Sequence, residues 1–170
     1  MIEAPSALLH LFAPWQRFYA DSTTAETSVT FLHLAAMMFG GGFAIAADRR
    51  TLRTRPHPDG FDDALAELHG IHRPVLIALG VLFVSGLALA TADLETFLAS
   101  PIFLLKLVIV ALLLLNGGFL VQTEQALSRL SPAGPTPTVQ RLWRRLRAVS
   151  WASLVLWTAA VLVGTMLVNA

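Results

Sequence analysis

Two polar side chains near the start of long apolar segments could bind a ligand. His33 opens the stretch "HLAAMMFGGGFAIAADRR", and Lys106 lies in "FLLKLVIVALLLL". Each lies about five residues, or ~8 Å, inside its segment from the same end of the predicted bundle. They are therefore expected to share a layer. A histidine inside a bundle of membrane helices can hold a ligand, or it can be a structural residue bonded to a backbone or hydroxyl group. Both interpretations stay open.

The chemistry of this layer depends on where Lys106 points. If its amine faces inward, two potentially cationic groups lie together, which favours a bound anion or a neutral imidazole. A propionate, a carboxylate or a quinone oxygen would suit such a layer. Alternatively, Lys106 reaches out to the membrane interface. Of the other histidines, His10 on the N-terminal segment could fold back toward His33. The candidate cofactor-binding residues are His33, Lys106 and His10.

Metal and haem binding are further possibilities for the histidines. Met37 follows His33 by four residues, and a thioether beside an imidazole suits copper(I), although methionines on membrane helices also serve packing. His69 and His72 have i,i+3 spacing, which could place them in a divalent metal site. A single haem with His33 as axial ligand is compatible with the sequence. Covalently attached haem is excluded, because the chain has no cysteine.

The elements that must position these residues are membrane-spanning helices. The chain has 170 residues, of which 55% are hydrophobic and only 14% charged, whereas soluble domains have about 25% charged residues. Four apolar blocks are long enough to cross a bilayer and must then be helical. We predict one all-α membrane domain over residues 1–170, a bundle of four transmembrane helices at 29–47, 74–92, 101–121 and 148–168.

Two features refine this bundle. Residues 5–20 combine Leu, Phe, Trp and Tyr with Gln and Arg, which predicts an N-terminal helix in the membrane interface or, alternatively, a loop packed on the bundle. On the first span, Ala36, Gly40, Ala44 and Asp48 repeat at spacing four. Small residues at this spacing allow close approach of another helix. Gly40 is therefore predicted at a helix–helix contact, and His33 on the same face or its edge.

The basic residues predict how the chain crosses the membrane. Ten of the twelve Lys and Arg residues surround the connections between the first and second spans and between the third and fourth spans. Basic residues concentrate on the cytoplasmic side of membrane proteins. Both termini are then expected in the periplasm, with the chain in the inner membrane of a bacterium. In the second of these connections, Trp143 is expected at the level of the lipid headgroups.

Two stretches resemble a known group of proteins. "FLHLAAMMFGGGFAIAADRRTLR" and "GVLFVSGLALATADLETFLASPIFLLKLVIVALLLLNG" resemble a family of small four-helix bacterial integral membrane proteins of uncharacterised function. The resemblance covers roughly residues 30–120. It is carried by these positions: His33, Asp48, Arg50, Ser85, Gly86, Phe103, Lys106 and Asn116. The chain is more distantly similar to the membrane domain of CopD-type copper-resistance proteins, which implies a copper-handling role by analogy.

Three functions are compatible with these observations. The first is an integral membrane protein that binds a cofactor, a metal or a lipid-like ligand in its periplasmic half. The second is an accessory subunit of a larger respiratory or photosynthetic membrane complex, and the third is CopD-like copper transport. The expected partners are the lipid bilayer and other membrane subunits, with no nucleic acid. The sequence shows no nucleophile–base pair, no phosphate-binding loop and no paired carboxylates inside the membrane, so an enzyme is the least favoured class.

Overall fold

The computed structural model describes the backbone of residues 6–53, 61–130 and 136–168, and within these ranges the side chains of all but residues 6, 7, 61–73 and 168. In this part of the chain all regular secondary structure is helical, which confirms the predicted all-α bundle. The helices are α1 (Ser6–Asp21), α2 (Thr23–Arg53), α3 (Phe61–Ala92), α4 (Leu94–Ala99), α5 (Pro101–Ser128) and α6 (Pro137–Val168).

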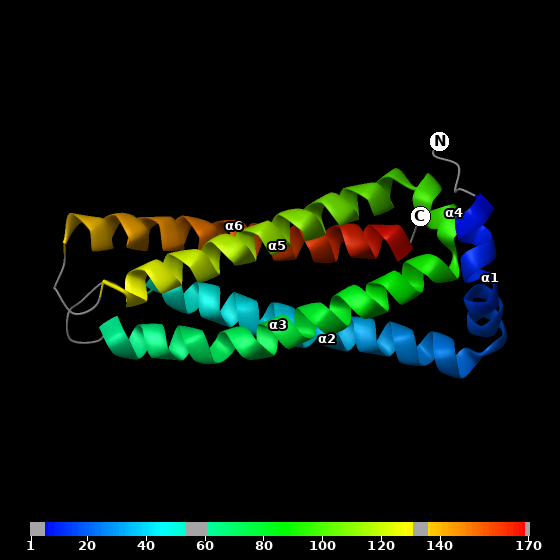
Figure 1. Cartoon of the computed structure of the whole chain (residues 1–170), viewed down its shortest axis with the longest axis horizontal. Helices are drawn as coiled ribbons and strands as arrows, with labels where there is room; N and C mark the ends of the chain where they lie inside the picture. The colour runs from blue at the N-terminus through cyan, green and yellow to red at the C-terminus, as the bar shows by residue number, and fades with distance from the viewer. Residues whose placement is uncertain (1–5, 54–60, 131–135, 169–170) are drawn as a thin grey trace.

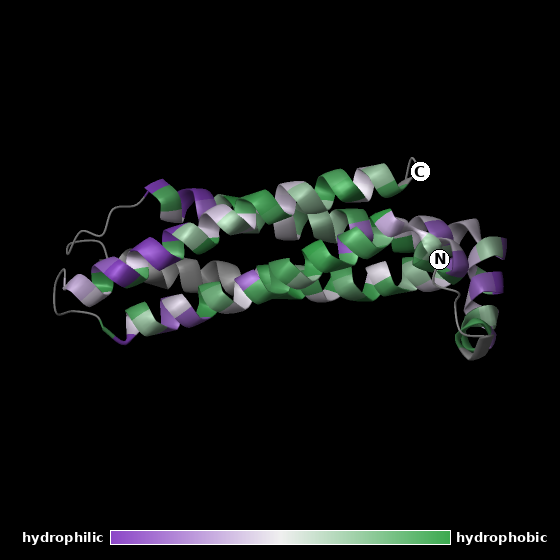
Figure 2. Cartoon of the chain, turned by 90° about the horizontal axis from the view of Figure 1, so that it is seen from above, coloured by the Kyte–Doolittle hydropathy of each residue, from purple (hydrophilic) through white to green (hydrophobic). Residues whose placement is uncertain are grey.

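Four of these helices are long and apolar enough to cross a membrane, namely α2, α3 from Pro74 onward, α5 and α6. Each predicted span lies inside one of them, and each helix continues past its predicted span at one end or at both ends. Figure 2 shows apolar residues along the middle of the bundle and hydrophilic residues concentrated at its two ends. The chain is therefore a multi-pass helical bundle with the composition of a membrane protein.

The distribution of side chains is the reverse of that in a soluble bundle. Large apolar side chains face outward, as shown by Phe31 (66% exposed) and Val84 (67% exposed). Several polar side chains are buried instead: Asp48, Thr51, Ser85, Thr91, Thr123, Glu124, Ser150 and Ser153. An apolar surface around a partly polar interior suits hydrocarbon surroundings.

Local signals explain where α5 begins. Ser100 caps α5 by accepting a hydrogen bond from the Phe103 backbone amide, and Pro101 occupies the first turn, where its missing N–H costs nothing. α3 begins at Phe61, before the predicted span 74–92, and has Pro74 inside it. The apolar segment that could cross the membrane begins at Pro74, as predicted.

The four long helices form an incomplete ring. α2 packs along both α3 and α6, and α5 packs along α6, but α3 and α5 make few contacts with each other (Figure 1). Gly40 permits the close approach of α2 and α3, because a Cβ added there would lie 2.8 Å from the Ala78 Cβ. This confirms the prediction that Gly40 lies at a helix–helix contact. The neighbouring Gly41 faces the Trp157 ring of α6 at 3.3 Å by the same measure.

α1 lies across the end of the bundle where both termini are found (Figure 1). The indole nitrogen Nε1 of Trp15 donates to the Ala88 carbonyl at 3.0 Å, and Nε2 of Gln16 donates to the Thr91 carbonyl at 3.2 Å. Both acceptors belong to the last turns of α3. The predicted N-terminal segment is therefore a helix that is held against the end of the bundle by its polar side chains.

At the opposite end, α5 and α6 continue past the apolar spans and form a small core of their own. It consists of Leu127, Val139, Trp143 and Leu146. Trp143 is only 3% exposed. Its ring fills the space between the two helix ends, and its position at the level of the headgroups stays a prediction.

Candidate functional site

His33 is half-buried in the bundle and has a hydrogen-bond partner on another helix. Its Nδ1 atom lies 3.0 Å from the Ser85 hydroxyl of α3, and its ring packs against Gly86, where an added Cβ would lie 3.1 Å from Cε1. The structural interpretation of His33 expected a backbone or hydroxyl partner, and the hydroxyl of Ser85 is such a partner. The absence of a side chain at Gly86 makes room for the ring.

The hydroxyl of Ser85 determines which nitrogen of His33 carries a proton. Ser85 Oγ donates to the Val81 carbonyl at 2.6 Å, so it accepts from His33. Nδ1 is therefore the donor in the neutral imidazole, and Nε2 keeps its lone pair. A histidine that ligates a metal or haem iron also uses one nitrogen as ligand and the other as a donor to a protein group. The ligand role predicted for His33 is compatible with this geometry and stays a prediction.

Lys106 points into the bundle. Its Nζ atom lies 3.6 Å from the position of a Cβ at Gly164 of α6, and its charge is close enough to His33 to interact with it. The predicted shared layer of His33 and Lys106 therefore exists at the end of the bundle near the termini.

The remaining candidate residues are spread over the molecule. His10 is exposed on α1 and lines a hollow of about 310 Å³ with Asp93 and Glu95, and no hydrogen bond in the described part of the chain joins it to His33. Met37 is partly buried on α2. The side chains of His69 and His72 lie outside the described residues. Among the residues that are described, no three His, Cys, Asp or Glu side chains are grouped as a metal site.

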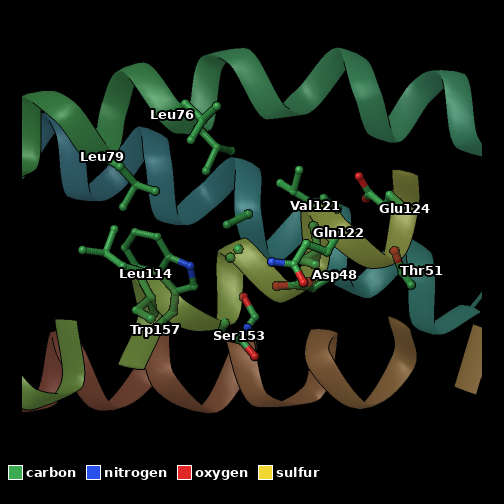
Figure 3. A pocket seen from close by; sticks show the side chains of 18 of the residues that line it. Asp48, Thr51, Leu76, Leu79, Leu114, Val121, Gln122, Glu124, Ser153 and Trp157 are labelled. Atoms are coloured by element: carbon green, nitrogen blue, oxygen red, sulfur yellow. The ribbon is translucent and has the colours of Figure 1, made fainter. Parts of the chain in front are cut away.

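A larger cavity lies in the half of the bundle farther from the termini. It has a volume of about 620 Å³ and is lined by all four long helices. Figure 3 shows apolar side chains toward one side, among them Leu79, Leu114 and Trp157, and polar ones toward the other, among them Asp48 and Glu124. We call it the membrane cavity. Its lining residues are Ala44, Ala47, Asp48, Thr51, Val75, Leu76, Leu79, Leu113, Leu114, Asn116, Gly117, Gly118, Leu120, Val121, Gln122, Glu124, Gln125, Ser153 and Trp157.

Two buried carboxyl groups from different helices meet at the polar side of the cavity. Asp48 of α2 is 2% exposed and Glu124 of α5 is 1% exposed, and their charges are close enough to interact. These two carboxyl groups were not among the candidate site residues expected from the sequence. Both residues lie just beyond the predicted spans 29–47 and 101–121, and charged residues at such positions are usually exposed to solvent. Asp48 does continue the stripe of small residues that includes Gly40, and this spacing is the one feature of the sequence that indicates that Asp48 faces another helix.

Asp48 has hydroxyl groups beside it on a third helix. Ser150 and Ser153 of α6 both lie next to its carboxyl group. One carboxyl oxygen, Oδ2, nevertheless has no hydrogen-bond partner. Between α5 and α6, Asn116 of α5 donates to the Val149 carbonyl at 3.1 Å and so fixes α5 against α6 near the cavity. The cavity thus combines apolar walls with a buried acceptor at its polar side.

No model of a protein family, curated protein or solved structure matches the chain. The likeness to small four-helix bacterial membrane proteins and to CopD-type domains stays a prediction. The functional argument therefore rests on the geometry of the bundle.

Proposed function

We propose that the protein binds a lipid-like ligand from the bilayer in the membrane cavity. The observation that carries this proposal is an apolar cavity of about 620 Å³, lined by four membrane helices, with buried carboxyl groups at one side. Binding sites for small molecules typically have volumes of about 300–1,000 Å³ and apolar walls with a few convergent polar groups. A ligand with a hydrocarbon part and a polar part matches the apolar walls and the buried carboxyl groups of this lining.

The open side of the helix ring supports entry from the membrane. α3 and α5 both line the cavity but make few contacts with each other. Leu76 of α3 (61% exposed) and Leu114 of α5 (49% exposed) flank this side. An apolar ligand could pass between the two helices without crossing the polar ends of the bundle. This route explains why the cavity lies within the apolar part of the helices.

The proposed orientation places both termini in the periplasm of a bacterium and the membrane cavity in the cytoplasmic half of the inner membrane. It is supported by the clustering of basic residues around the two longer connections. Reporter fusions at positions 58 and 134 are then expected to show cytoplasmic activity. An exported reporter at either position would contradict this orientation.

Accessory-subunit and copper-transport functions stay predictions. The first would use the apolar outer surface as a contact for other membrane subunits, and the second would use His33 and Met37. Neither depends on the membrane cavity.

The proposed function can be tested by photolabelling in lipid nanodiscs with an alkyl alcohol that carries a diazirine. We expect adducts on α3 around Leu76 and on α5 around Leu114. Gly117→Phe should abolish most of this labelling. Gly117 lines the cavity, and a Cβ added there would meet no described atom within 4 Å. The phenyl ring can therefore occupy the cavity without displacing a neighbouring helix.

Gly80→Phe is the matched control. Gly80 lies on α3, a Cβ there would also meet no described atom within 4 Å, and it does not line the cavity. This variant should label like the wild type. Equal labelling of the wild type and Gly117→Phe would contradict the proposal, as would adducts confined to residues outside the cavity.

A further inference from the structure

Asp48 lines the membrane cavity (Figure 3), and its carboxyl oxygen Oδ2 has no hydrogen-bond partner among the described residues. The side chain is 2% exposed, so bulk water does not solvate it. A carboxylate in apolar surroundings is strongly unfavourable unless another group compensates its charge. Ionisable residues inside membrane bundles mark ligand and ion sites for this reason. The oxygen Oδ2 therefore points to a ligand that supplies the missing partner.

The charge of the cavity indicates the charge of that ligand. Among the described residues that line it, Asp48 and Glu124 are acidic and none is Lys, Arg or His. The two carboxyl groups come from α2 and α5 and are close enough to repel each other when both are ionised. A positive charge between them would offset this repulsion, whereas an anion would increase it.

An aromatic ring extends the site along α6. Trp157 is one helical turn from Ser153, which lies beside Asp48, so the two side chains share a face of the helix. The ring packs against Gly41 and is 5% exposed, which fixes its position. The face of an indole ring attracts organic cations. Carboxylate and indole together thus favour a cation that is bulky and weakly hydrated.

The remaining wall favours hydrocarbon over a bare metal ion. Leucine side chains from α3 and α5 line the side of the cavity opposite the carboxyl groups (Figure 3). The described residues contain no group of three metal-ligating side chains. A small inorganic ion would leave this apolar volume unfilled, but an organic cation with a hydrocarbon part would occupy it.

We propose that the membrane cavity binds an organic cation with an apolar portion. The positive charge lies against Asp48, near the ring of Trp157, and the hydrocarbon lies between α3 and α5. This inference rests on the proposed function and adds the charge of the ligand to it. Asp48 is the counter-ion, and Glu124 lies close enough to interact with its charge.

Two ions of the same shape and opposite charge test the inference. Tetraphenylphosphonium and tetraphenylborate are compared as competitors of the diazirine photolabel, at equal measured concentrations in the nanodisc membrane. Tetraphenylphosphonium should protect α3 and α5 from photolabelling at a concentration at least about tenfold lower than the concentration of tetraphenylborate that gives the same protection. Asp48→Asn should raise the half-protecting concentration of tetraphenylphosphonium by about tenfold or more. Glu26→Gln, which removes an exposed carboxylate from the same helix, should leave it unchanged.

The outcomes separate this inference from the function on which it rests. Equal protection by the two ions would overturn the cation assignment, and so would an unchanged response of Asp48→Asn. Labelling of the cavity that neither ion reduces would overturn it as well, while still supporting a lipid-like ligand. Absence of labelling in the wild type would contradict the proposed function itself. If Asp48→Asn does not fold, the comparison of the two ions on the wild type decides whether the cavity prefers a cation.

Discussion

Gly40→Leu is expected to destabilise the bundle by at least about 3 kcal/mol, enough to prevent recovery of folded protein. A Cβ at Gly40 would lie 2.8 Å from the Cβ of Ala78, which is closer than two non-bonded carbon atoms normally approach. Even a small excess of side-chain volume in a packed core costs about 1–3 kcal/mol, and leucine adds several carbons. Helices α2 and α3 would have to separate. Thermal unfolding in detergent, followed by circular dichroism and by the yield of monodisperse protein, measures the effect.

Gly42→Leu provides the control for this substitution on the same helix. A Cβ at Gly42 would meet no described atom within 4 Å, and the position is exposed. The leucine would face hydrocarbon, so we expect wild-type stability or slightly more, since leucine favours helix over glycine. Equal stability of the Gly40 and Gly42 variants would show that α2 and α3 do not pack as described.

Leu146→Ala is expected to lower the free energy of unfolding by about 2–5 kcal/mol, the usual cost of a large cavity in a core. The side chain is fully buried, at 0% exposure, in the small core formed with Leu127, Val139 and Trp143. Its loss would loosen the ends of α5 and α6. Reversible unfolding in mixed micelles gives the free energy.

Leu162→Ala is the matched control on α6. Leu162 is 60% exposed on the apolar outer surface, so its truncation leaves no internal cavity and should change stability by less than about 0.5 kcal/mol. If both leucine variants lose the same stability, the core at the end of α5 and α6 does not contribute as described.

The spans and the Gly40 contact could be predicted because they depend on local patterns. Hydrocarbon thickness sets the length of an apolar block, and small residues at spacing four mark close approach between helices. The partner helix, α3, could not be named from α2 alone. Any helix with a small residue at the same depth, such as Ala78, would satisfy the pattern.

The polar residues show where local patterns are insufficient. A polar partner for His33 follows from the cost of burying an unpaired imidazole. That this partner is Ser85 does not follow, because the sequence does not show which residue of α3 lies beside His33. The pair of Asp48 and Glu124 depends on helices α2 and α5, which are far apart in the sequence. It also depends on both helices continuing past the apolar blocks, which the hydropathy boundaries do not reveal.

The membrane cavity likewise arises from packing rather than from composition. α3 and α5 are both apolar, but α3 packs along α2 and α5 packs along α6, and the two make few contacts with each other. Gly117 and Gly118 leave additional space on α5 where it faces the cavity. The sequence alone does not show that these glycines face a cavity, because this depends on the positions of the other three helices.

Native mass spectrometry of protein released from nanodiscs tests the central claim, ligand binding in the membrane cavity, most directly. The account predicts that the wild type and Gly80→Phe retain a bound molecule, seen as a discrete added mass, and that Gly117→Phe is released without it. A wild-type protein released without any bound molecule would contradict the account. The same added mass on Gly117→Phe would also contradict it, because the ligand would then lie outside the cavity.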